Sequence, residues 1–307
     1  MNKVALIGVG KWGINYYKSL KKLHIQKKIN FFILSKLNTK KISSLDSNFK
    51  IKIVSNKKLF KYNINNLIIS TPPDTHFDIV IKAIKKKIAI LIEKPVTMTF
   101  KDTLYIKKMV EMYQTPFLVN HQYLLSPFYL KLKKLVNMNK ITKIYSEGHG
   151  IGPPRDYSSL LDWAPHDLSM IFDLTGMNKK YSITKVKKFR ISKNLCNWNI
   201  QMKIDKINIK ISIGNNYKKK SRKFIVYESS GKVAVFNDKN TDKYKLIYNN
   251  EKINLPISLP LDNKIKQFLK ISSFYKDQKQ RNNYKYLKDI NLSLKIAKCI
   301  ENIYYSY

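Results

Sequence analysis

The beginning of the chain constrains the fold more than any other stretch. Residues 4–10, VALIGVG, form a near-continuous apolar run that ends in glycine, which is typical of a parallel strand buried on both faces. The run continues into GVGKWG, which has the spacing G-x-G-x-x-G, and residues 14–24 then carry apolar side chains at helical intervals. A strand, a glycine turn and a helix in this order predict the start of a βαβ unit.

The glycines of this turn, Gly8, Gly10 and Gly13, have the spacing of a dinucleotide site. The first glycine permits a tight turn, the second lets the backbone approach a pyrophosphate, and the third lets helix and strand pack closely. The N-terminus of the following helix then offers free N–H donors to the phosphates. We therefore predict that this turn, with Lys11 and Trp12, binds a dinucleotide, and a turn that is only structural is the alternative.

The residues after the second predicted strand bear on the type of dinucleotide. An NAD site usually carries an acid about twenty residues beyond the glycines, where it binds the ribose hydroxyls. This chain has Ser35 and Lys36 there. An acid would repel a 2′-phosphate, whereas a hydroxyl and a cation can hold one, so the sequence favours NADP over NAD by a narrow margin. In so lysine-rich a chain, Lys36 can also stand there by chance.

Strands and helices alternate through the first 120 residues, and the pattern changes afterwards. The predicted strands are 29–34, 50–54, 66–73, 88–95 and 116–121, and the helices between them include 74–86 and one that ends near 112. Such alternation implies right-handed crossovers and a doubly wound parallel sheet, the Rossmann fold. From residue 182 onward, apolar and polar residues alternate in five stretches, which is typical of antiparallel strands with one buried face.

Further helices are expected at 128–137, from about 162, at 263–275 and at 286–304. We therefore predict an α/β chain of two domains. Residues 1–121 form a dinucleotide-binding Rossmann domain. Residues 122–307 form an α+β domain with a largely antiparallel open sheet for substrate binding and oligomerisation, and its C-terminal helices can pack back on the first domain.

The formal net charge of +39 suggests a nucleic acid or an anionic surface as partner. Only four of the 59 basic residues are arginines, however, and the lysines are spread along the whole chain. A nucleic-acid-binding protein tends to concentrate its positive charge on one face and to use arginine, whose guanidinium makes paired hydrogen bonds to phosphates and base edges. The accompanying excess of Ile, Asn, Tyr and Phe favours an AT-rich genome as the source of the lysines, so we expect no nucleic-acid partner. RNA binding is kept as an alternative.

Cysteine content and hydropathy bear on location. The two cysteines, Cys196 and Cys299, lack the CxxC spacing of a zinc or redox site and suggest a reduced, cytoplasmic compartment. The N-terminal apolar run is too short for a secretory signal. No apolar run approaches the roughly 18 residues of a transmembrane helix, so we expect no membrane partner.

Four motifs in order resemble the Gfo/Idh/MocA oxidoreductase family, the group of glucose–fructose oxidoreductase and inositol dehydrogenase. They are ISTPPDTHFDIVIKAIKKKIAILIEKP (residues 69–95), VNHQYLLSP (119–127), LLDWAPHDLSM (160–170) and PLDNKIKQFLK (260–270). Their order and spacing extend over nearly the whole chain, which makes the set far more specific than any one motif.

The resemblance implies roles for residues of the first domain. In that family the EKP lysine, here Lys94, lies beside the nicotinamide and binds the reacting hydroxyl. Glu93 and the segment with Thr71, Pro72 and His76 would line the cofactor, although His76 can equally serve to pack its helix. The chemistry supports the transfer, because a lysine at the carboxyl end of a parallel strand lies where such sheets bind ligands and can stabilise a developing alkoxide.

The D-x-x-x-H pattern of the third motif consists of Asp162 and His166. If a helix begins near Pro165, the proline occupies the first turn, where its missing N–H has no cost, and Asp162 can be the N-cap or reach a ligand. Histidine titrates near neutral pH and suits acid/base chemistry. For an isolated pattern we would favour a core histidine and a capping aspartate, whereas the resemblance implies a catalytic His166 with Asp162 as its supporting acid.

This chain departs from the family pattern at several positions. Ala164 and Ser169 stand where a glycine and an acid are common, and Asp167 follows the histidine directly. Asn120 and Leu124 stand where a glycine and an arginine are common. These departures leave Lys94, Asp162 and His166 in place and lie near the substrate motif, so we expect Asp167 and Ser169 to bear on substrate choice.

The predicted activity is hydride transfer between NADP or NAD and a secondary alcohol or ketone of a sugar, nucleotide sugar or cyclitol. Tyr123 and, from the loop at residues 150–159, Arg155 and Tyr157 would bind the substrate, although an exposed loop without a ligand role is as consistent with the sequence. The resemblance also implies a homo-oligomer, and this chemistry requires no metal. The alternatives are a sensor that binds a sugar nucleotide or cofactor without turnover, and a basic nucleic-acid-binding protein on a Rossmann scaffold.

Overall fold

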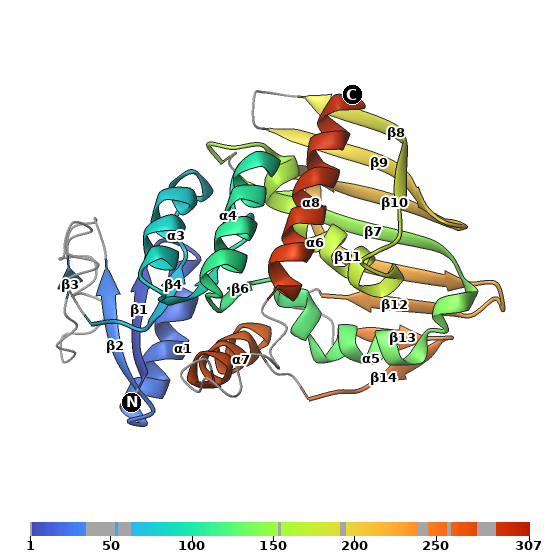
Figure 1. The fold of residues 1–307 in the computed structure, drawn as a ribbon. Coiled ribbons are helices and arrows are strands. Elements are labelled where there is room, and N and C mark those ends of the chain that lie inside the picture. The colour runs from blue at the N-terminus through green and yellow to red at the C-terminus, as the bar shows by residue number, and fades with distance from the viewer. Residues whose placement is uncertain are drawn as a thin grey trace. The chain divides into compact units, whose positions relative to one another are not determined.

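The computed structural model describes residues 2–34, 53–54, 63–152, 155–190, 195–238, 245–256, 259–274 and 287–307. The chain divides into two compact units (Figure 1). Unit 1 comprises Met1–Asn120 and Leu261–Asn291, and unit 2 comprises His121–Pro260 and Leu292–Tyr307. Residues 261–291 thus belong with the N-terminal part of the chain.

Unit 1 contains a six-stranded sheet in the order β3-β2-β1-β4-β5-β6. Every neighbouring pair is parallel, which confirms the predicted doubly wound sheet. The strands are β1 (Asn2–Ile7), β2 (Ile29–Leu34), β3 (Ile53–Val54), β4 (Asn66–Ile69), β5 (Ala89–Ile92) and β6 (Phe117–Val119). The prediction of a strand over 66–73 is too long, because a 3₁₀ turn, η2 (Pro73–Thr75), follows the strand at the proline pair.

Helices cover both faces of this sheet. On one face, α3 (His76–Lys85) and α4 (Phe100–Tyr113) run side by side and share a core with alternate residues of β1, β4, β5 and β6 (Figure 1). On the other face, α1 (Gly13–Ile25) and α7 (Pro260–Phe274) pack on the intervening residues of the same strands. Strands whose residues are buried on both faces explain the continuous apolar runs of the sequence.

Unit 2 contains an eight-stranded sheet in the order β14-β13-β12-β11-β7-β10-β9-β8. Only β7 and β10 pair in parallel, so the prediction of a largely antiparallel sheet is confirmed. The strands are β7 (Ile141–Ile151), β8 (Tyr181–Arg190), β9 (Cys196–Ile204), β10 (Ile207–Gly214), β11 (Asn216–Glu228), β12 (Val233–Asn237), β13 (Leu246–Tyr248) and β14 (Glu251–Ile253).

The sequence pattern did not reveal β7, although β7 is one of the two central strands of this sheet. Its inward-facing positions beyond Ile144 are Ser146, Gly148 and Gly150, which present no apolar side chain to form an alternating pattern. A Cβ at either glycine would approach the indole ring of Trp163. Gly148 and Gly150 therefore make room for a helix that packs closely on the sheet.

Three helices pack on one face of this sheet: α5 (Pro127–Leu135), α6 (Ser159–Thr175) and the part of α8 (Lys288–Tyr305) that follows Asn291. Figure 1 shows α6 and α8 lying across the strands. Two 3₁₀ turns, η3 (Gln122–Leu125) and η4 (Met138–Lys140), flank α5. Side chains on the other face, among them Tyr145, Ile225, Tyr227 and Val235, are half-buried.

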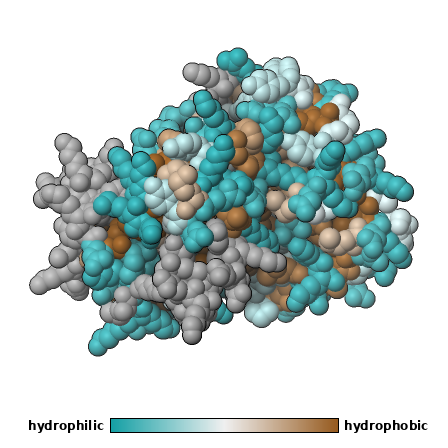
Figure 2. Space-filling view, viewed as in Figure 1, coloured by the Kyte–Doolittle hydropathy of each residue, from teal (hydrophilic) through white to brown (hydrophobic). Residues whose placement is uncertain are grey.

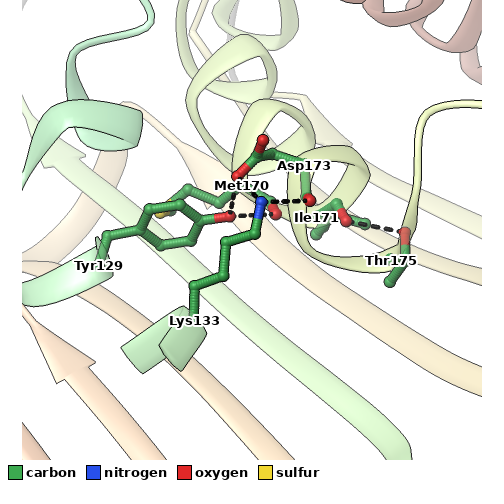
Figure 3. A network of polar contacts seen from close by, with 6 residues as sticks. All are labelled: Tyr129, Lys133, Met170, Ile171, Asp173 and Thr175. Atoms are coloured by element: carbon green, nitrogen blue, oxygen red, sulfur yellow. Dashed lines mark hydrogen bonds and ion pairs between the residues drawn. The ribbon is translucent and has the colours of Figure 1, made fainter. Parts of the chain in front are cut away.

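A polar network joins α5 to the last turns of α6 (Figure 3). The Tyr129 hydroxyl lies 3.0 Å from Met170 O and 2.9 Å from Asp173 Oδ2, so two acceptors share its proton. Lys133 Nζ donates to the backbone and carboxylate oxygens of Asp173 at 3.0 and 2.8 Å. Burial and the Asp173 carboxylate raise the pKa of Tyr129 well above its usual value. The network therefore fixes the C-terminal half of α6 against α5.

Removal of the Tyr129 hydroxyl tests this anchor. We expect Tyr129→Phe to lower the free energy of unfolding by about 1–2 kcal/mol, because a buried carbonyl and a carboxylate lose a donor. Denaturant unfolding measures the change. Tyr105→Phe is the matched control, since Tyr105 is exposed and packs only its ring on Phe77. An equal effect of the two substitutions would contradict the anchoring role.

Figure 2 shows hydrophilic side chains over most of the viewed face, as the lysine content leads one to expect. Among the helices that the structure describes, none has both the length and the hydropathy that crossing a membrane would require.

Candidate functional site

The glycine turn between β1 and α1 is packed closely against the end of β4. Gly8 has φ +89°, and a Cβ there would lie 2.8 Å from backbone atoms of Ser70 and Thr71. A Cβ on Gly13 would collide with Gly8 O and with the Ser70 hydroxyl. That hydroxyl donates to Gly8 O at 2.6 Å. Gly8 and Gly13 are thus required by the fold of the turn itself.

Gly10 differs from the other two glycines, because a Cβ there would meet no atom of the described residues within 4 Å. The described part of the protein therefore does not by itself require glycine at this position. Helix α1 begins at Gly13 without a side-chain cap and without an acid in its first turn. The N–H groups of Ile14 and Asn15 donate to the backbone, to Gly10 O and Trp12 O. Open space at the second glycine beside an uncapped helix N-terminus fits the pyrophosphate of a dinucleotide.

The Glu93 carboxylate connects the glycine turn to the ends of two strands. Its Oε1 accepts hydrogen bonds from the Trp12 indole at 2.7 Å, the Tyr16 hydroxyl at 2.7 Å and the Asn120 amide at 2.6 Å. Glu93 is buried, whereas Trp12 is 40% exposed. Burial and the Glu93 charge raise the pKa of Tyr16 well above its usual value, so this phenol stays a donor. Three donors on one oxygen hold the end of β5 at a fixed place beside the turn.

Lys94 follows Glu93 directly and is half-buried. The neighbouring Thr71–Pro72 segment is tied to the same strand end through His76. The His76 ring is buried, with Nε2 2.9 Å from Thr71 O and Nδ1 3.1 Å from Pro95 O. Burial lowers the pKa of His76. Since both ring nitrogens face backbone carbonyls, His76 acts here as a tie between the two segments, and its contact with a cofactor stays a prediction.

The D-x-x-x-H helix begins earlier than the sequence suggested. Helix α6 starts at Ser159, and the Ser158 side chain caps it by accepting from Leu160 N at 3.2 Å. The prediction of a start near Asp162 or Pro165 is therefore wrong, because Ser158 supplies the cap. Pro165 lies inside the helix, where its missing N–H leaves Leu161 O without its usual donor. Asp162 and His166, four residues apart, lie on the same side of the helix.

The Asp162 carboxylate binds residues of the preceding loop. Arg155 Nε donates to Asp162 Oδ2 at 2.7 Å, and the Tyr157 hydroxyl lies 3.5 Å from Oδ1. The Arg155 guanidinium also lies 5.8 Å from the centroid of the Tyr157 ring. The Arg155 side chain is 57% exposed, whereas that of Asp162 is 16% exposed. The structure thus brings together three residues that the sequence singled out for substrate or acid/base roles.

The half-buried His166 ring packs against Tyr123. Their ring centroids are 5.3 Å apart, and the planes meet at 80°, an edge-to-face contact. Tyr123 also contacts the ring of Phe236 at 6.1 Å. Burial raises the pKa of Tyr123, so its hydroxyl stays protonated near neutral pH.

The expectation that Asp167 and Ser169 bear on substrate choice is wrong, because neither is accessible. Asp167 is fully buried and pairs with Arg222 Nη1 at 2.9 Å. Ser169 is buried as well, and its hydroxyl donates to His166 O at 2.8 Å. Both residues serve the internal packing of α6.

Two candidate residues cannot be placed, and two residues of the site were not predicted from the sequence. Ser35 and Lys36, on which the preference for NADP rested, lie outside the described residues. Tyr16 and Arg222 were not singled out from the sequence, although an arginine in a chain of lysines was a usable signal. Among the residues that the structure describes, no group of three His, Cys, Asp or Glu side chains could hold a metal ion.

Comparisons with known proteins bear on the family of the N-terminal residues and on the fold. Residues 2–121 match the family model described as "Oxidoreductase family, NAD-binding Rossmann fold". A search of the curated proteins found no match.

Solved structures share the fold over the whole chain. KijD10, a 3-ketoreductase from Actinomadura kijaniata in complex with NADP and TDP-benzene, has a TM-score of 0.83 at 13% identity, covering 99% of this chain and 97% of that chain. UDP-N-acetylglucosamine 3-dehydrogenase GnnA from Acidithiobacillus ferrooxidans has a TM-score of 0.79 at 15% identity, with coverage of 99% and 97%. GenD2 from gentamicin A biosynthesis, in complex with NAD, has a TM-score of 0.78 at 11% identity, with coverage of 99% and 93%. At these identities the likeness shows the fold alone. The family model adds sequence evidence for residues 2–121, which match the NAD-binding Rossmann domain of the Gfo/Idh/MocA oxidoreductases.

Proposed function

We propose that this chain transfers a hydride between NADP or NAD and a secondary alcohol or ketone of a sugar, most specifically a nucleotide sugar. The observation that carries the proposal is the connection of the glycine turn, through Trp12 and Glu93, to the strand end that bears Lys94. The dehydrogenase of a UDP-sugar and the ketoreductase bound to a TDP compound, which have the same fold, support the nucleotide-sugar class.

A bound nicotinamide nucleotide would supply the hydride acceptor or donor, and the protein would supply orientation and electrostatics. The turn with Gly8, Gly10, Lys11 and Gly13 would hold the pyrophosphate. Glu93 would fix Trp12, and the segment from Thr71 to His76 would line the cofactor, with Pro72 exposed for contact.

The Lys94 ammonium would bind the oxygen of the reacting carbon and stabilise the negative charge that develops there during oxidation. His166 would take the hydroxyl proton as general base, and would return it in the reductive direction. Asp162 would orient the substrate or His166. The contacts of Asp162 with Arg155 and Tyr157 connect this aspartate to the preceding loop. Arg155 has an exposed guanidinium that suits a phosphate of the substrate. Tyr157 and Tyr123 would contact substrate hydroxyls.

We further propose a homo-oligomer in a reducing compartment. The half-buried apolar side chains on the open face of the eight-stranded sheet, with Tyr145, Ile225 and Tyr227 among them, would be covered by a second copy. Both cysteines are buried thiols that form no disulfide in the described part of the chain, which suits the cytoplasm. We expect no membrane or nucleic-acid partner.

A thermal-shift experiment with NADH, NADPH and RNA tests the proposal against its alternatives, since a ligand that binds only the native state raises the melting temperature. We expect a rise with a nicotinamide nucleotide and none with RNA. The sensor alternative predicts the same rise without turnover of any nucleotide sugar. A rise with RNA alone, which weakens steeply with salt, would replace the proposal by the nucleic-acid alternative.

Lys94 is tested by substitution. We expect Lys94→Met to reduce turnover to background while the dissociation constant for NADPH changes little, because the ammonium acts on the substrate oxygen. Absorbance at the reduced-nicotinamide band measures turnover, and fluorescence titration measures binding. Lys85→Met, at the exposed end of α3, is the control that should keep full activity. Full activity of Lys94→Met would remove this residue from the mechanism.

A further inference from the structure

Two of the four arginines of the chain pair with aspartates on α6 that lie next to or near His166. Arg155 pairs with Asp162, four residues before the histidine, and Arg222 pairs with Asp167, immediately after it. The first pair is largely exposed at the arginine, whereas the second pair is buried at both partners. Since 55 of the 59 basic residues are lysines (59 less four arginines), the use of arginine at both places singles out this helix.

The buried pair lies between the sheet and α6. Arg222 stands on the inward face of β11, and its Nη1 contacts both Asp167 oxygens, at 3.1 and 2.9 Å. The hydroxyl of Ser146, on β7, donates to Asp167 Oδ1. A Cβ on Gly148 would lie 2.5 Å from Arg222 Nη1, so the missing side chain at Gly148 makes room for the guanidinium.

Stability alone does not account for this pair. Removing two charges from water is expensive, and a well-packed apolar pair often stabilises a core equally well or better. The surrounding inward-facing residues, such as Phe224 and Val226, are apolar. Within the described part of the chain, Arg222 Nη2 is buried and has no hydrogen-bond partner, which a pair selected for stability would avoid.

The Arg222 guanidinium is linked to His166 through the ring of Tyr123. Its carbon lies 4.6 Å from the centroid of the Tyr123 ring, and the same ring makes the edge-to-face contact with His166. Asp167, the partner of Arg222, is the next residue after His166. The imidazole is therefore constrained through its neighbour in the backbone and through the ring against which it packs, and Arg222 takes part in both constraints.

We propose that Arg222 is a positioning residue for His166: with Asp167 it fixes the Tyr123 ring and the turn of α6 that together orient the imidazole. The inference rests on the proposed acid/base role of His166 for its effect on turnover, whereas the orientation itself is independent of that role. Lysine would supply the charge but not the planar guanidinium that both lies over the Tyr123 ring and reaches the carboxylate.

The test compares the wild type with Arg222→Met/Asp167→Leu, which removes both charges together, and with Arg222→Lys. The double substitution is used because Arg222→Met alone leaves a buried carboxylate without its partner. The probe is the set of imidazole nitrogen and carbon-bound proton resonances of histidine-labelled protein. The chain has only five histidines, and the spectrum of His166→Asn identifies the signal of His166.

We expect the His166 ring resonances to move more than those of the other four histidines, and to report a mixture of tautomers, in the double variant. We expect kcat on the best nucleotide sugar to fall about 10- to 100-fold with KM little changed, as for a misplaced catalytic group. Arg222→Lys should lie between the wild type and the double variant in both measurements. Lys133→Met/Asp173→Asn, which removes a different ion pair of α6, nearer its C-terminus, is the control and should leave the His166 resonances unchanged.

Unchanged His166 resonances in a folded double variant overturn the proposal. If the double variant does not fold, Arg222→Lys decides: a shift confined to His166 supports the proposal, and no shift overturns it. If the wild type turns over no nucleotide sugar, the proposed function fails, but the resonances still decide whether Arg222 positions the imidazole.

Discussion

His166→Asn should lower kcat/KM by about 10²–10⁴-fold while the dissociation constant for NADPH and the melting temperature stay close to those of the wild type. The size follows from the usual contribution of a positioned general acid/base. Nucleotide binding should survive because the glycine turn and Glu93 belong to unit 1, whereas His166 belongs to unit 2. Asparagine keeps hydrogen-bonding capacity and about the same length, but it does not carry a proton near neutral pH.

The measurement is steady-state kinetics with saturating nucleotide across a pH series. His24→Asn is the matched control, since His24 is a histidine of unit 1 whose Nδ1 contacts Ile29 O at 2.9 Å, and this substitution should leave kcat/KM unchanged. A His166→Asn variant with wild-type kcat/KM would exclude the histidine as the proton carrier.

Gly10→Ala should abolish or strongly weaken binding of NADPH without lowering the melting temperature. A Cβ at this position meets no atom of the residues that the structure describes within 4 Å, so we expect the fold to tolerate it. The same Cβ occupies the space through which a pyrophosphate would approach the backbone. We expect the dissociation constant for NADPH to rise at least about tenfold, which corresponds to about 1.4 kcal/mol of binding free energy.

Gly13→Ala is the informative comparison for Gly10→Ala. Its Cβ would collide with Gly8 O, so this variant should lose both nucleotide binding and stability. Thermal unfolding of the two variants measures the loss of protein stability, and fluorescence titration measures the loss of affinity for NADPH. Together they separate a clash within the turn from a clash with the ligand. If Gly10→Ala binds NADPH as tightly as the wild type, the turn does not hold a pyrophosphate.

Much of the fold could be predicted because its signals are local. The buried parallel strands of unit 1 are visible in the sequence as apolar runs. Four of the strands of unit 2 show alternating apolar and polar residues over most of their length. Strand β7 could not be found in this way, since Ser146, Gly148 and Gly150 occupy its inward positions. Strand β11 was predicted only from residue 223, because NYKKKSR, its first half, carries no apolar residue after Tyr217 to show the period.

Parts of the candidate site could be predicted where a sequence motif fixes the backbone. They could not be predicted where the role of a residue depends on whether tertiary packing buries it. The glycine spacing identifies the turn, and the EKP sequence identifies the strand end at Lys94. Asp167 was expected to bear on substrate choice, and its burial against Arg222 was not foreseen, because spacing along a helix does not show which residue of the neighbouring sheet it contacts. That partner, Arg222, stands just before the strand that the alternation predicted, so nothing in the local pattern marked it as buried.

The most direct test of the central claim is turnover itself. The wild type is incubated with NADP or NAD and each member of a nucleotide-sugar set, and formation of the reduced nicotinamide is followed by absorbance. The account predicts reduced nicotinamide with at least one nucleotide sugar, and loss of that signal in His166→Asn and in Lys94→Met. A wild type that neither binds a nicotinamide nucleotide nor turns over any sugar or nucleotide sugar, in either direction, would contradict it.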